Sequence, residues 1–191
     1  MCATVGIGVG VATQLLQGVL PGDANWAANS LSAWLVVAFG AASRAPLVRS
    51  AAAGAVALLL AALVGYEVVV EARFGTGWGS LVSFWAAGAI VGGLVFGPAG
   101  WAWRHGGRWA RATGVALLAA LFVAEGVYLS AILVDRNVGI VLVGLGLAIP
   151  LILSPTWRQR RTAYLVVLPC LALGAAGYAA MLVAYGWWAG R

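Results

Sequence analysis

The chain has 191 residues, of which 63% are hydrophobic and only 8% are charged. A soluble domain carries about 25% charged residues, so the composition excludes a water-soluble globule. The length accommodates one compact unit, and we expect a single transmembrane domain over residues 1–191. The net charge is +6 and every basic residue except one histidine is arginine. Because these arginines lie between apolar segments, they indicate membrane orientation and predict no nucleic-acid partner.

Apolar segments long enough to cross about 30 Å of hydrocarbon follow one another along the whole chain. In order they cover residues 3–20, 26–42, 51–72, 79–100, 112–134, 138–153 and 163–186. The first lacks a preceding basic region, which favours a spanning helix over a cleaved signal peptide. The second and sixth are short, so six spans remain an alternative if one of them is re-entrant. The predicted fold class is an all-α polytopic transmembrane bundle of seven helices.

Arginine placement predicts the orientation of this bundle. One set of alternate loops holds eight arginines and the opposite set holds three, and the richer set is expected in the cytoplasm. The richer set is Arg44, Arg49, Arg104, Arg108, Arg111, Arg158, Arg160 and Arg161, and the poorer set is Arg73, Arg136 and Arg191. Seven spans then place the N-terminus inside, the C-terminus outside and the chain in the cell membrane as a multi-pass protein.

Small residues recur four positions apart in several segments. Gly6 and Gly10, and Gly93 and Gly97, are examples among 27 glycines. This spacing lets helix backbones approach closely in lipid, and it predicts packing within the bundle.

Two glutamates lie inside predicted spans, Glu67 in the third and Glu125 in the fifth. A carboxyl group at membrane depth is costly when ionised and is a functional candidate by default; when neutral it can act as a general acid. Glu71 follows Glu67 by four residues and shares its helical face. A structural hydrogen bond or ion pair, such as Glu71 with Arg73, is the alternative for each acid.

The alternating direction of the spans places these acids in the outer half of the membrane, together with aromatic and amide side chains. The expected layer of ligand-contacting residues, besides the acids, consists of Asn29, Trp34, Tyr66, Phe84, Trp85, Tyr128 and Tyr178. Tryptophan and tyrosine also form belts at the membrane surface. Four of these residues lie deeper than such a belt, namely Trp34, Trp85, Tyr128 and Tyr178.

The sequence lacks the residues that several kinds of chemistry require. A retinal Schiff base requires lysine, which is absent, and bis-histidine haem requires a second histidine beside His105. Asp23 and Asp135 are isolated rather than grouped in a magnesium motif, and Cys2 and Cys170 have no metal-ligand spacing. No glycine loop followed by lysine is present to hold a phosphate. We therefore expect no metal and no cofactor.

Two functions fit an apolar pocket with protonatable carboxyls and aromatic walls. The first is acid-initiated cyclisation of a polyene, in which aromatic rings stabilise the cation and water is excluded. The second is binding or transport of a small apolar or aromatic molecule. A structural subunit that only packs against partners is a third class.

Two resemblances bear on this choice. The pattern Asn29-Ser30 with Trp34, Gly65-Tyr66, Phe84-Trp85, Gly92-Gly93 with Phe96-Gly97 and Gly100, and Glu125-Gly126 with Tyr128 resembles an uncharacterised family of actinobacterial multispanning proteins. In size, helix number, acids and aromatics the chain also resembles the small membrane-integral terpene cyclases of prenylated-indole and meroterpenoid pathways. That resemblance implies a hydrophobic prenylated substrate and a catalytic acid, with Glu67 as the first choice for this role and Glu125 as the second. With Glu67 as the acid, Glu125 is the other expected catalytic residue, which would orient Glu67 or accept the proton. The runner-up resemblance is to substrate-binding subunits of energy-coupling vitamin transporters, which usually have six spans.

Overall fold

The computed structural model describes residues 2–20, 25, 28, 30–76, 78–131 and 136–189. Within these ranges the chain forms seven α-helices and no strand. They are α1 (Cys2–Gln17), α3 (Leu31–Ala42), α4 (Val48–Phe74), α5 (Ser80–His105), α6 (Arg108–Ala131), α7 (Arg136–Leu153) and α8 (Trp157–Ala189). Each helix overlaps one predicted apolar segment, and the predicted all-α membrane bundle is confirmed.

Helix length divides the bundle into two groups. The five helices α4 to α8 are long and apolar enough to cross a membrane. The helices α1 and α3 have 16 and 12 residues. At about 1.5 Å per residue, α3 reaches only about 18 Å. The sixth predicted segment therefore forms a full-length helix, whereas the second forms a much shorter helix than expected.

The cap at Ser30 explains why α3 begins late. The Ser30 hydroxyl accepts a hydrogen bond from the Ala33 backbone N–H at 3.3 Å, which is the geometry of an N-cap. The helix consequently begins at Leu31, five residues after the predicted start of this apolar segment.

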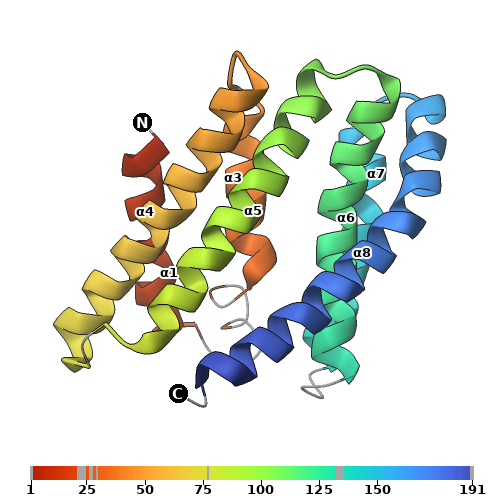
Figure 1. Cartoon of the computed structure of the whole chain (residues 1–191). Coiled ribbons are helices and arrows are strands. Elements are labelled where there is room, and N and C mark those ends of the chain that lie inside the picture. Colours follow the sequence, from red (N-terminus) through yellow and green to blue (C-terminus); the bar gives the residue numbers. More distant parts are fainter. Residues whose placement is uncertain are drawn as a thin grey trace.

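Successive helices run in alternating directions, so the two ends of the chain lie at opposite ends of the bundle (Figure 1). The turns joining α3 to α4, α5 to α6 and α7 to α8 share one end, as the arginine pattern predicts. Arg44, Arg108 and Arg158 all lie at this end, while Arg73 and Arg136 lie at the other. At that other end, α4 finishes at Gly75, whose left-handed φ of 61° suits glycine.

Glycines hold α1 and α5 against α4. A Cβ atom at Gly10 of α1 would collide with the backbone carbonyl of Ala62, and Gly6 touches the same helix one turn earlier. A Cβ atom at Gly97 of α5 would lie 2.7 Å from the Ala51 carbonyl oxygen. The predicted small-residue spacing thus acts in packing within the chain.

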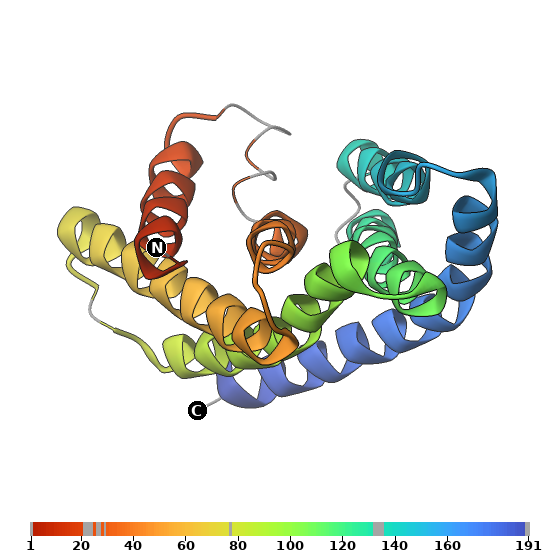
Figure 2. The ribbon, with the colours of Figure 1, turned by 90° about the horizontal axis from the view of Figure 1, so that it is seen from above.

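The short helix α3 stands inside an arc formed by the other helices (Figure 2). Its residues Leu35, Ala38, Phe39 and Ala42 are buried in a cluster with side chains of α4, α5 and α6. The largest helix, α8, bends in its first half (Figure 1) and contains Pro169, whose missing N–H interrupts the helical hydrogen bonds. Beyond the bend, α8 crosses α6 and reaches the first turns of α5.

Candidate functional site

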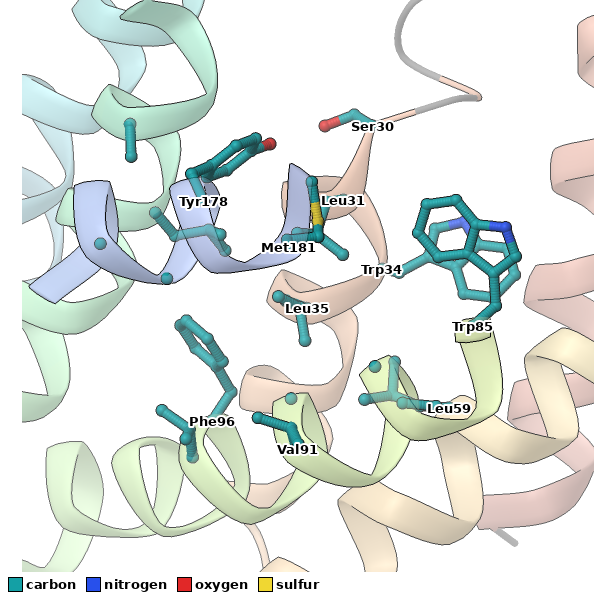
Figure 3. Close-up of a pocket in the computed structure, with 18 of the residues that line it drawn as sticks. Ser30, Leu31, Trp34, Leu35, Leu59, Trp85, Val91, Phe96, Tyr178 and Met181 are labelled. Atoms are coloured by element: carbon teal, nitrogen blue, oxygen red, sulfur yellow. The ribbon is translucent and has the colours of Figure 1, made fainter. Parts of the chain in front are cut away.

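A cavity of about 620 Å³ lies inside the bundle, walled by α3, α4, α5, α6 and α8 and touched by α1. Ligand pockets typically measure about 300–1,000 Å³, so this cavity has room for a small molecule. Most of its wall consists of leucine, valine, alanine, glycine and aromatic side chains. Figure 3 shows Trp34 and Trp85 on one side of the cavity and Phe96 and Tyr178 on the other.

The structure brings six of the ten predicted site residues to this cavity. Those that line it are Trp34, Tyr66, Glu67, Phe84, Trp85 and Tyr178. Glu71, Glu125 and Tyr128 do not line it, and Asn29 lies outside the described residues.

Aromatic rings form the wall near α4 and α5. The rings of Trp34 and Tyr66 meet edge to face with centroids 6.1 Å apart, and those of Phe84 and Trp85 meet similarly at 5.0 Å. The Tyr66 hydroxyl donates a hydrogen bond to the Gln17 side-chain oxygen at 3.1 Å, which ties α4 to α1. These contacts fix the orientation of the rings, and their π faces can stabilise a nearby positive charge.

Glu67 is the acidic residue that lines the cavity. It is partly buried on α4, and its carboxyl group has no hydrogen-bond or ion-pair partner among the described residues. Burying a polar group without a partner is unfavourable, and a carboxyl group without a partner at the edge of an apolar cavity is available to a ligand.

Glu71 and Tyr128 lie beyond the cavity for geometric reasons. Glu71 is exposed on α4, four residues and therefore about 6 Å farther along the helix axis than Glu67. Tyr128 is partly buried, and its ring lies 5.3 Å from that of Tyr178, which does line the cavity. The predicted ligand contacts of Glu71 and Tyr128 are therefore corrected: sharing a helical face or a membrane layer with the site did not bring them into its wall.

Glu125 binds the beginning of α3 instead of facing the cavity. One carboxyl oxygen accepts a hydrogen bond from the Leu31 N–H at 3.0 Å. The other accepts hydrogen bonds from the Ser32 N–H at 2.9 Å and from the hydroxyl groups of Ser30 and Ser32. Only 5% of Glu125 is exposed. A carboxyl group is well matched to the N–H groups and the positive dipole end of a helix, so Glu125 fastens α3 to α6.

Glycines and a serine of the cavity wall were not among the predicted site residues. A Cβ atom at Gly88 or Gly177 would meet nothing within 4 Å, so these glycines leave open space rather than permit helix contact. Ser30 also lines the cavity. A serine just before an apolar run, as Ser30 is, is an N-cap signal, and it would have placed the start of α3 but not its contact with Glu125.

No charged residue other than Glu67 lines the described wall of the cavity. Among the described residues, histidine, cysteine, aspartate and glutamate form no group of three or more that could hold a metal ion. The wall therefore offers one carboxyl group, a few hydroxyl and amide groups and a large apolar surface.

The fold and this cavity define a class of protein: an all-α multispanning membrane protein with a ligand-sized apolar cavity inside its bundle. The chain belongs to a family described as a family of unknown function (DUF6518), which matches residues 1–184. No curated protein and no solved structure matches the chain.

Proposed function

We propose that this protein is a membrane-embedded terpene cyclase in which Glu67 protonates a neutral prenylated polyene held in the cavity. The observation that carries the proposal is the unpartnered Glu67 carboxyl group beside an aromatic-lined apolar cavity of about 620 Å³. A neutral carboxylic acid in such surroundings can donate its proton to an alkene or an epoxide.

The reaction balances with Glu67 as both donor and acceptor of the proton. The acid proton forms a C–H bond at one alkene carbon and leaves a cation on the adjacent carbon. A second double bond attacks this cation and closes a ring. Loss of a proton from the new cation to the Glu67 carboxylate forms the product alkene and regenerates the acid. The product is an isomer of the substrate, and no second acid is required, which accords with Glu125 being bound to α3.

Aromatic side chains supply the remaining stabilisation. Trp34, Phe84 and Trp85 line the same cavity as Glu67, and a desolvated cation–π contact contributes up to about 2 kcal/mol. The apolar wall excludes water that would otherwise capture the cation.

The second candidate is a substrate-binding subunit of a transporter for a small apolar or aromatic molecule. The observation in its favour is α3, which has only 12 residues and begins inside the bundle at the cavity wall. Transporters often build their binding sites from such interrupted helices. In this function the ligand would leave the protein chemically unchanged.

Turnover by the purified protein separates the two candidates. Incubated alone with a prenylated indole or an epoxidised polyene, the protein is expected to form cyclic products of unchanged mass. In deuterated water, one deuteron should enter the product at the protonated carbon for an alkene trigger, or on oxygen for an epoxide trigger. Glu67→Gln should abolish turnover, because an amide is a far weaker acid.

The matched control is Glu71→Gln, which removes an exposed carboxyl group one turn away on the same helix. This variant should keep wild-type turnover. Wild-type turnover in Glu67→Gln would refute the proposed acid. Recovery of an unaltered bound molecule, with no conversion of any prenylated compound, would favour the binding subunit.

A further inference from the structure

Several side chains of α5 and α8 that line the cavity are also strongly exposed. Val91 of α5 is 62% exposed and Leu173 of α8 is 67% exposed, and both line the cavity. Trp85 and Val95 of α5 have the same two properties. Strong exposure of a side chain in the cavity wall is expected where the cavity opens to the surroundings. We call this opening, formed by Val91, Val95 and Leu173, the lateral mouth.

The paths of α5 and α8 explain where the lateral mouth lies. The two helices meet at one end, where the rings of Phe84 and Tyr185 meet edge to face with centroids 5.6 Å apart. There the Trp188 ring N–H also donates a hydrogen bond to the Ser83 hydroxyl at 2.9 Å. Farther along, α8 leaves α5 and packs on α6, where Cys170 is buried in a cluster with alanines of that helix. The helices diverge from their meeting point (Figure 1), and residues of both diverging parts, Val91 and Leu173, line the cavity.

The lateral mouth lies at the depth of the hydrocarbon rather than at the membrane surface. Val91 is near the middle of α5 (Ser80–His105), and Leu173 is at the midpoint of α8 (Trp157–Ala189). Both helices are long enough to span the bilayer. The lateral mouth therefore faces lipid chains, and its three side chains carry no charge.

We propose that the cavity takes its ligand sideways from the bilayer through the lateral mouth, and that this ligand is a neutral, flexible isoprenoid chain already dissolved in the membrane. The isoprenoid class rests on the function proposed above. Neutrality follows from the depth of the lateral mouth, because a diphosphate or carboxylate would have to lose its hydration in hydrocarbon to pass. The cavity wall, moreover, has no arginine among its described residues to receive such a group.

The test measures how fast a membrane-dissolved probe reaches the cavity. The full-length protein is reconstituted in phosphatidylcholine vesicles with a farnesol analogue that carries a diazirine, and capture after brief illumination is followed by mass spectrometry. Val91→Trp and Leu173→Trp narrow the lateral mouth. Each should slow capture by about tenfold, the effect of an added barrier of about 1.4 kcal/mol, and labels in the wild type should fall on α5 and α8.

Matched controls come from the same helices. Leu94 of α5 and Leu168 of α8 are 56% and 69% exposed but do not line the cavity. Leu94→Trp and Leu168→Trp add the same bulk to the lipid-facing surface and should leave the capture rate unchanged. Unchanged rates in both mouth variants, or equal slowing in the controls, would overturn the lateral route.

Two further measurements separate this inference from the proposed chemistry. Capture of the probe by the wild type without turnover of any prenylated compound would refute the cyclase and leave the route standing. The diphosphate ester of the same probe should not label the cavity. Labelling by that ester at the rate of the alcohol would overturn the neutral ligand.

Discussion

Glu67 and Glu125 are the same residue type in different surroundings, and those surroundings separate their roles. The oxygens of Glu125 accept hydrogen bonds from the first turn of α3 and from two serine hydroxyl groups. The Glu67 carboxyl group has no such partner in the described part of the chain and borders the cavity. Hydrogen bonds to a carboxyl group hold it in place, whereas a free one is available to a ligand.

Removal of the Glu125 carboxyl group should destabilise the protein. In Glu125→Ala the donors of Leu31 and Ser32 lose their acceptor inside the bundle, and an unsatisfied buried donor costs about 1–3 kcal/mol. We expect a lower midpoint of thermal unfolding in detergent, followed by circular dichroism, and a smaller decrease for Glu125→Gln, which retains one acceptor oxygen. An unchanged midpoint in Glu125→Ala would show that these hydrogen bonds do not hold α3.

The opposite result is expected at Glu67. Glu67→Gln breaks no hydrogen bond among the described residues and removes an ionisable group from membrane depth, so its unfolding midpoint should equal or exceed that of the wild type. The same thermal measurement tests this, with Glu71→Gln on the exposed part of α4 as the reference. A marked loss of stability would reassign Glu67 to a structural role.

At the scale of elements, α3 shows what local sequence can and cannot predict. The apolar segment itself was predicted, because its length and composition suffice. Its late start depends on the Ser30 cap, which is a local signal, and on Glu125, which lies 95 residues farther along the chain. No local pattern indicates that Glu125 would bind the start of this helix, so the sequence-based prediction of a catalytic role for Glu125 could not take this contact into account.

Open glycines of the cavity wall should control which ligands fit. Gly88→Leu and Gly177→Leu extend side chains into empty space and should leave the fold intact. We expect a bulky prenyl probe to bind more weakly by roughly 1–3 kcal/mol, the usual penalty of overpacking, as measured by equilibrium competition in detergent. Gly144→Leu in α7, also open but away from the cavity, is the control and should bind the probe normally. Equal binding by all three variants would mean that the probe occupies another place.

At the scale of the whole molecule, the order and direction of the helices could be predicted from the sequence, but which helices pack against one another could not. Arginine-rich and arginine-poor turns alternate, and the structure gathers each kind at its own end. Neighbours are harder to predict because lipid-facing and core-facing surfaces are both apolar, so an apolar stripe that marks the buried side is absent. The cavity enclosed by α3, α4, α5, α6 and α8 became visible only in three dimensions.

The orientation of the bundle is a prediction that fusion reporters can test. The eight arginines of the richer set should face the cytoplasm. A reporter inserted in the Arg104–Arg111 region should therefore read as cytoplasmic, and one fused after Arg191 should read as extracytoplasmic. A cytoplasmic reading after Arg191 would mean that one of the two shorter helices, α1 or α3, does not cross the membrane.

The bond between Glu125 and α3 also has a consequence for how the protein is made. During synthesis α3 leaves the ribosome well before α6, since Ser30 and Glu125 are 95 residues apart. Until α6 arrives, the first N–H groups of α3 lack their acceptor, and such groups are strongly disfavoured in hydrocarbon. A helix of 12 residues is also too short to insert by itself. Final seating of α3 should therefore follow insertion of α6. In a nascent chain that ends before Glu125, a cysteine introduced into α3 (Ala33→Cys, with Cys2 replaced by serine) should react with water-soluble thiol reagents.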